Sequence, residues 1–187
     1  MQTFAAPSGN DLAKCAAITG ELARLECYDG LSKTFKLSPQ PLLPKPSEES
    51  GKWKSYSKTN PIDDSTTVIV SLEADTGTND RGEKTSLVIR CKSNETDLLV
   101  NWDDYLGRDA YVLSRVGNNK AKTQTWSITT DSKGAFHPSP IAFIKELLTA
   151  DKLVTQITPY NESPVTSVFS TAGLSNAIKP IRDTCKW

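Results

Sequence analysis

After residue 52 the chain alternates between apolar and polar residues over short segments, a pattern that predicts β-strands. The segment TTVIVSLEA is rich in β-branched residues, and turn signals such as DTGTNDRGE and VGNN separate such segments from one another. Eight of them occur, at residues 52–58, 66–74, 85–91, 97–102, 110–116, 123–129, 153–158 and 165–170. Short strands with gaps of hairpin length predict an antiparallel β-sandwich or barrel.

Two segments in this part of the chain follow the helical period instead. The first, SPIAFIKELLTA at 139–150, starts with Ser139 as its N-cap and Pro140 at the first helical position. The second precedes the C-terminus, where helical spacing relates Leu174, Ile178, Ile181 and Cys185. Pro180 lies inside this second helix and is expected to kink or split it.

The first 35 residues are also helical in pattern, with one interruption. The spacing i, i+4, i+7 predicts a buried apolar stripe at Ile18, Leu22 and Leu25. Thr19-Gly20 breaks the pattern, because Thr19 is a good N-cap. We therefore predict two helices, at about 11–18 and 20–34, which fold back on each other as a hairpin.

The predicted hairpin decides whether Cys15 and Cys27 can form a disulfide. On one unbroken helix Cys15 and Cys27 would lie about 18 Å apart, whereas a disulfide needs Cα atoms within roughly 7 Å. In a hairpin the same two positions can face each other, so a bond between them becomes geometrically possible.

Four prolines within residues 39–46 predict a stiff, extended linker after the hairpin. The expected organisation is a helical hairpin at 1–37, a Pro-rich linker at 38–50 and a β-rich domain with a C-terminal helix at 51–187. The predicted fold class is α+β, in which the β-sandwich or barrel carries two helices.

Charge and hydropathy narrow the classes of partner. Lys plus Arg and Asp plus Glu both number 22, so no net positive field attracts nucleic acid or anionic lipid. No apolar run approaches the ~20 residues of a membrane span. The start, MQTFAAPSGND, is too short and too polar for a secretory signal. The protein is then either cytosolic or an exported chain from which a signal has been removed.

The four cysteines bear on that choice. They form no C-x-x-C pair, and the chain has one histidine, so a Cys₂His₂ zinc site is excluded and a Cys₄ site lacks its usual close pairs. No metal or other cofactor is expected. An even number of cysteines without metal spacing favours two disulfides and an oxidising compartment. The alternative is four buried thiols in a cytosolic domain.

Asp63 and Asp64 are the most suggestive candidates for chemistry. Adjacent carboxylates can share a proton or hold a cation, although turn and capping hydrogen bonds explain such a pair equally well. Trp102 and Trp126 lie in or beside predicted strands, where core packing competes with a stacking platform for sugar or peptidoglycan. The one histidine, His137, is expected to be a solvated loop residue.

No catalytic residue is assigned. The sequence contains no G-x-S-x-G, Walker or G-x-G-x-x-G motif.

A set of short stretches, in a fixed order, carries a family resemblance. They are CAAITGELARLECYD, GKW, NPIDDSTTVIVSLEA, LVIRC, WDDYLG, RVG, the pattern W-x-x-T-x-D from Trp126 to Asp131, TPYNESPVTSVFSTAGL and the closing C-x-W. Together they cover nearly the whole chain and resemble the TagO/VasI proteins associated with bacterial type VI secretion. Related sequences also occur in phages and prophages.

The resemblance implies an exported, non-catalytic accessory protein of the bacterial envelope. We expect it to be periplasmic, with its signal peptide absent from this sequence, and to bind a secretion or phage protein through residues that include Asp63, Asp64, Trp102, Trp126 and Asp131. The alternatives are a phage-encoded envelope factor, for superinfection exclusion or lysis, and a peptidoglycan-binding module.

Of the three possible cysteine pairings, we expect Cys15–Cys27 and Cys91–Cys185. The first closes the helical hairpin. The second joins the strand TSLVIRC to the last helix, where Cys185 lies on the apolar stripe.

Overall fold

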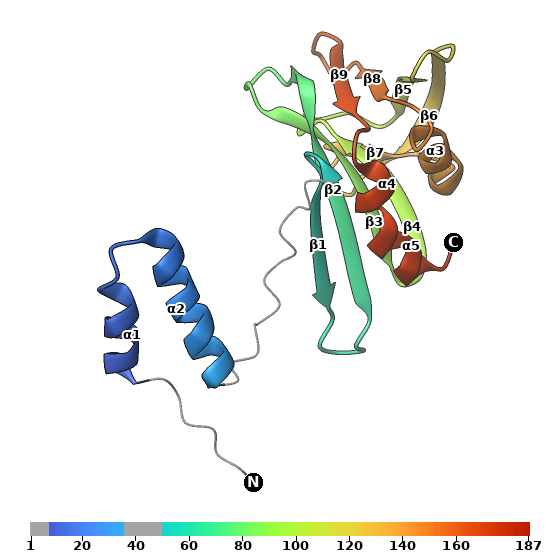
Figure 1. Ribbon diagram of the computed structural model, residues 1–187. Coiled ribbons are helices and arrows are strands. Elements are labelled where there is room, and N and C mark those ends of the chain that lie inside the picture. The colour runs from blue at the N-terminus through green and yellow to red at the C-terminus, as the bar shows by residue number, and fades with distance from the viewer. Residues whose placement is uncertain (1–7, 36–49) are drawn as a thin grey trace. The chain divides into compact units, whose positions relative to one another are not determined.

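The computed structural model describes residues 8–35 and 50–187 (Figure 1). The chain divides into two compact units, Met1–Leu43 and Pro44–Trp187. Residues 38–49 of the predicted linker lie outside the described residues, so the predicted domain boundaries remain predictions.

The first unit contains a pair of helices, α1 (Gly9–Ala16) and α2 (Glu21–Thr34). Ser8 caps α1 in a capping box, because its side chain accepts a hydrogen bond from the backbone N–H of Asp11 while the Asp11 carboxylate accepts from the N–H of Ser8. The chain turns between the helices at the predicted break. Cys15 and Cys27 form a disulfide with their Cα atoms 5.5 Å apart, as the hairpin allows.

The apolar stripe expected in this unit is not buried. Leu22 and Leu25 are 79% and 58% exposed, and Cys15 alone is buried among residues 8–35. Two short helices present few surfaces to each other, so they leave most of their apolar side chains in contact with water. That part of the prediction was wrong.

The second unit is a closed antiparallel barrel with one additional strand. Its strands are β1 (Lys54–Thr59), β2 (Thr66–Thr78), β3 (Lys84–Lys92), β4 (Glu95–Asn101), β5 (Ala110–Val116), β6 (Lys122–Ile128), β7 (Gly134–Phe136), β8 (Lys152–Ile157) and β9 (Val165–Ser170). They follow the order β1-β2-β3-β4-β7-β6-β5-β8-β9, and β9 pairs back onto β2. The eight strands from β2 to β9 thus close the barrel, and β1 lies outside it against β2. The predicted α+β fold class is confirmed.

Of the eight strands that follow β1 in the structure, seven were predicted, and β7 was missed. It consists of Gly134, Ala135 and Phe136, which is too short for an alternating pattern to show. It nonetheless bridges β4 and β6, so the barrel closes through a strand that periodicity could not detect.

A glycine permits the closing contact between β2 and β9. Gly77 has φ +109°, and a Cβ at this position would lie 2.5 Å from the carbonyl oxygen of Thr166. Any larger side chain would therefore push the two strands apart. Beside it, the hydroxyls of Thr85 and Ser167 are hydrogen-bonded at 2.7 Å in the interior.

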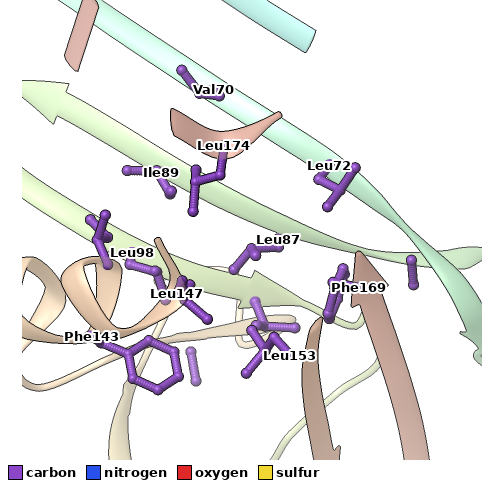
Figure 2. Close-up of a cluster of buried hydrophobic side chains, with 14 of the residues drawn as sticks. Val70, Leu72, Leu87, Ile89, Leu98, Phe143, Leu147, Leu153, Phe169 and Leu174 are labelled. Atoms are coloured by element: carbon purple, nitrogen blue, oxygen red, sulfur yellow. The ribbon is translucent and has the colours of Figure 1, made fainter. Parts of the chain in front are cut away.

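The core fills the barrel from both the strands and the helices. Alternate residues of β2, β3 and β4 point inward, and side chains from three helices meet them: α3 (Pro140–Leu147), α4 (Leu174–Ala177) and α5 (Lys179–Cys185). Figure 2 shows Leu147 and Leu174 among strand residues such as Leu87, Ile89 and Phe169. The last helical segment is split next to Pro180, as expected, with Ile178 between α4 and α5.

A disulfide joins α5 to the barrel wall. Cys91 on β3 and Cys185 on α5 are bonded with their Cα atoms 5.8 Å apart, which is the predicted pairing. Nearby, the indole Nε1 of Trp187 donates a hydrogen bond to the hydroxyl of Thr96 at 2.7 Å. The C-terminal segment is thus fixed by one covalent and one polar contact.

Candidate functional site

Four loops meet at one end of the barrel, which we call the loop end. They are residues 79–83, 102–109, 129–133 and 158–164, and they share one end because consecutive strands run in opposite directions. Backbone hydrogen bonds join the loops to one another: Trp102 N–H to Lys133 O (3.1 Å), Leu106 N–H to Ser132 O (2.9 Å) and Tyr160 N–H to Tyr105 O (2.9 Å). The loop end is therefore a braced surface rather than four separate turns.

Arg81 is the central cation of the loop end. Its guanidinium forms ion pairs with Glu83 at 3.1 Å, Asp103 at 3.4 Å and Asp104 at 3.3 Å. It also donates a hydrogen bond to the backbone carbonyl of Asp103. One side chain from the β2–β3 turn thus holds the loop that follows β4.

The Asp104 carboxylate is the most unusual group in this network. Its side chain is 1% exposed, and neither of its oxygens accepts a hydrogen bond from a described residue. Burial raises its pKa, against the opposing effect of Arg81. Burying a carboxylate with one ion pair and no hydrogen-bond donor lowers the stability of the folded state. This position is therefore a candidate for a functional role.

Asp103, its neighbour, has the opposite electrostatics. The ammonium of Lys133 lies 2.7 Å from its carboxylate and, together with Arg81, lowers the pKa of Asp103 to about 2. Adjacent residues thus hold one carboxylate firmly ionised and one that resists ionisation.

Glu162, in the β8–β9 loop, extends this acidic region. One of its carboxylate oxygens is buried without a hydrogen-bond partner among the described residues, and burial and the charge of Asp104 raise its pKa. With Asp80, Glu83, Asp103, Asp104, Asp109 and Asp131, the loop end has seven carboxylates against the three cations Arg81, Arg108 and Lys133. The surface is acidic although the chain as a whole is neutral.

Two tyrosines flank the acidic region. Tyr105 and Tyr160 are 56% and 62% exposed, and their rings meet edge to face with centroids 5.9 Å apart. Both come from braced loops, so their rings are held in place without being buried. Exposed, preordered tyrosines are typical of protein-binding surfaces.

Asp63 and Asp64 lie away from this region, in the β1–β2 turn at the opposite end of the barrel. Asp63 accepts hydrogen bonds from the backbone N–H and hydroxyl of Ser65 at 3.1 and 2.8 Å, and these bonds lower its pKa. Asp64 adopts a left-handed backbone conformation with φ 55°. Their observed contacts are those of a turn.

Trp102 and Trp126 are 0% and 2% exposed, so neither presents a ring face to a ligand. Their observed role is core packing. Asp131 does lie at the loop end, where it accepts hydrogen bonds from the Thr129 hydroxyl and the Lys133 N–H at 2.6 and 3.1 Å. Of the five predicted binding residues, the structure brings Asp131 and the backbone of Trp102 to the loop end and does not gather the others there.

The expectation that His137 is solvated was wrong. The loop that contains it folds against the barrel wall, so the imidazole is only 8% exposed. It stacks on Phe143 with ring centroids 4.1 Å apart and meets Trp126 edge to face at 4.9 Å.

Arg81, Tyr160 and Glu162 were not singled out by their sequence pattern. Tyr105, Tyr160 and Glu162 fall within the stretches WDDYLG and TPYNESPVTSVFSTAGL, which carry the family resemblance, so that signal was available. Arg81 lies in an ordinary turn sequence, and only the topology reveals its partners.

Within residues 8–35 and 50–187, no three His, Cys, Asp or Glu side chains are arranged to hold a metal ion. In the same part of the chain, no helix is both long and apolar enough to cross a membrane.

Comparison with known structures agrees with the barrel fold. The structure is similar to the crystal structure of invasion associated protein B from Bartonella henselae, with a TM-score of 0.53 and 12% sequence identity over 74% of this chain and 96% of that one. At this identity the likeness shows a shared fold. No curated protein matches the sequence.

The chain is therefore a small barrel protein whose fold is shared with that invasion associated protein. A family model, described as "Type VI secretion system VasI, EvfG", matches residues 14–187. The chain belongs to the VasI family of type VI secretion system proteins, as its sequence resemblance indicated.

Proposed function

We propose that this protein is a periplasmic accessory protein of type VI secretion that binds another envelope protein through the loop end of its barrel. The observation that carries the proposal is the exposed Tyr105–Tyr160 pair beside the buried Asp104 carboxylate. Family membership supports the link to secretion, and the stretches that carry the resemblance supply both tyrosines. The protein acts in this proposal by binding and not by catalysis.

The electrostatics of the loop end indicate what the partner presents. Seven carboxylates against three cations favour a basic surface, and tyrosine rings also stack well on guanidinium groups. The partner's contact surface is accordingly expected to contain arginine or lysine side chains.

Site-specific photo-crosslinking in the native bacterium tests the proposal. A photoreactive phenylalanine at Tyr105 or Tyr160 should yield one discrete adduct with an envelope protein. The same residue at Tyr56, which is 48% exposed on β1, is the matched control and should not. Equal adducts from all three positions, or none from the loop end, would contradict the proposal.

A functional measurement accompanies the crosslink. Tyr105→Ala/Tyr160→Ala should reduce type VI secretion into the medium, with the melting temperature nearly unchanged because both rings are exposed. Tyr56→Ala should secrete normally.

Both disulfides support a periplasmic location, since such bonds persist in oxidising compartments. Cell fractionation, with mass spectrometry of non-reduced peptides, tests this point. Recovery in the cytoplasmic fraction with four free thiols would refute it.

A further inference from the structure

A pocket of about 500 Å³ lies on the barrel wall, away from the loop end. It is formed by β5, β6, the turn that joins them and the first turn of α3. Val116, Ala142 and Phe143 give it apolar walls, and its polar lining includes Asn119 and Gln124. Its size is in the range of small-ligand sites.

The charges that line this pocket are mainly positive. Lys120 and Lys122 are both exposed, and neither forms an ion pair with any residue in the described part of the chain. Glu146 is the single acidic residue of the lining. A pocket with two uncommitted ammonium groups attracts an anion of low charge.

His137 also lines the pocket, with a ring that is neutral and almost fully buried. Its Nδ1 accepts a hydrogen bond from the backbone N–H of Ser139 at 2.9 Å, so the proton of the neutral ring lies on Nε2. That Nε2 has no acceptor among the described residues and is closed to solvent, so a ligand in the pocket does not reach it. Burial lowers the pKa of His137 to about 4, which keeps the ring neutral and this tautomer in place at neutral pH.

The pocket lies along one side of α3. Ser139, Ala142, Phe143 and Glu146 line it, and their spacing of i, i+3, i+4 and i+7 is that of one helix face.

We propose that this pocket binds a small ligand that carries a carboxylate. Lys120 and Lys122 supply the attraction, the side-chain amides of Asn119 and Gln124 supply hydrogen-bond donors, and the walls at Val116 and Phe143 contact an apolar group next to the carboxylate. This site is separate from the loop end and does not depend on the proposed function.

A carboxylate fits this lining better than a phosphate does. Glu146 repels a dianion more strongly than a monoanion, and no arginine lines the pocket to clamp a phosphate. The apolar walls also favour a ligand with a short hydrocarbon part. The free carboxylate end of a peptide or amino-acid derivative has this chemistry.

An NMR titration of the intact, disulfide-bonded protein with N-acetyl-L-alanyl-L-alanine tests the proposal. The amides of Lys120, Lys122 and Phe143 should shift saturably, and the C-terminal amide of the same peptide should produce no saturable shift. N-acetyl-D-alanyl-D-alanine is a parallel probe that distinguishes a cell-wall source of the carboxylate from a protein source. Inorganic phosphate should bind more weakly than either peptide.

Substituting the two exposed lysines of the pocket tests their role in binding directly. Lys120→Ala/Lys122→Ala should weaken binding about tenfold while leaving the fold intact, because both side chains lie in water. Lys58→Ala, an exposed lysine on β1, is the matched control and should bind as the wild type does.

Four results would overturn the proposal. Three of them are no saturable shift at pocket residues with either peptide acid, equal binding of the peptide amide, and unchanged affinity in Lys120→Ala/Lys122→Ala. Tighter binding of phosphate than of both acids would also overturn it.

Discussion

The helical hairpin and the barrel each contain one disulfide, but the two bonds act on very different amounts of packing. Among residues 8–35 only Cys15 is buried, whereas the barrel buries a continuous core that includes Phe169, Leu147 and Trp102. The hairpin therefore depends on its covalent link for structure. The barrel has a fold that its link reinforces.

This difference shows why chain length between cysteines is a poor guide to what a disulfide does. In the chain-entropy description, the 94-residue separation of Cys91 and Cys185 constrains the unfolded chain more than the 12-residue separation of Cys15 and Cys27 does. The shorter loop nevertheless matters more locally, because little else holds its two helices together.

The largest expected effect comes from removing the hairpin bond. In Cys15→Ala/Cys27→Ala, α1 and α2 should lose their stable helical structure, since helices of 8 and 14 residues are marginal in water by themselves. Hydrogen exchange followed by NMR should show amides of residues 9–34 exchanging at unfolded rates, with barrel amides unchanged. If the hairpin amides of this variant stayed protected from exchange, the hairpin would not depend on its disulfide.

The next largest difference between the two units should come from truncating one apolar side chain in each. Phe169→Ala should lower the free energy of unfolding of the barrel by about 3–5 kcal/mol. The matched change in the hairpin, Leu25→Ala, removes a side chain that is 58% exposed and should cost no more than about 0.5 kcal/mol. Urea denaturation of both variants measures this, and a large loss for Leu25→Ala would mean that its apolar face is covered in solution.

Removing the barrel disulfide should have a somewhat smaller effect. Cys91→Ala/Cys185→Ala is expected to lower the free energy of unfolding by about 2–4 kcal/mol while the barrel stays folded. Near-ultraviolet circular dichroism should keep its tryptophan signal, and hydrogen exchange should increase mainly in α5. Complete unfolding of the barrel would show that its core is not self-sufficient.

Lowering the pH should produce the smallest difference in stability between the hairpin and the barrel. The folded-state pKa of Asp103, about 2, lies below its ordinary value of 3.8, so its stabilising contribution is present above pH 4 and is lost as the pH falls towards 2. Asp11 shifts in the same direction in the hairpin, through its hydrogen bonds with Ser8. Asp104 shifts in the opposite direction, so its protonation in acid favours the folded barrel and partly offsets the loss.

The measurement for this last prediction is urea unfolding at pH 5, 3 and 2. Asp103→Asn should remove about 1 kcal/mol of the acid-dependent loss, a value reduced by solvent screening of its pairs with Lys133 and Arg81. An unchanged pH dependence in this variant would show that the loop-end ion pairs do not stabilise the barrel.

Alternation along the chain was enough to predict the strands, because each strand buries one face and exposes the other. It failed at β7, where three residues are shorter than one usable period, and in the hairpin, where Leu22 and Leu25 follow a buried spacing without a surface to bury them. Periodicity reports which residues could share a face. It does not report whether another element covers that face.

The candidate site was harder to predict for a different reason. Asp63 and Asp64 stood out because they are adjacent in sequence, yet a turn explains both. Arg81, Asp104 and Tyr160 come from three separate loops, and the alternating strand directions bring them together. Their association depends on strand order, which local sequence does not encode.

The outer position of β1 has a consequence for how the protein behaves when concentrated. Among the described strands β1 pairs on one side only, with β2, so its other side presents unpaired backbone groups of the kind that template aggregation between molecules. The strand is short and mostly exposed, and Lys58 places positive charge on it, whereas Lys54 is paired with Glu73 at 2.6 Å. Like charges meet when two such edges approach, so the strand outside the barrel protects a crowded solution of this protein against growth into fibres.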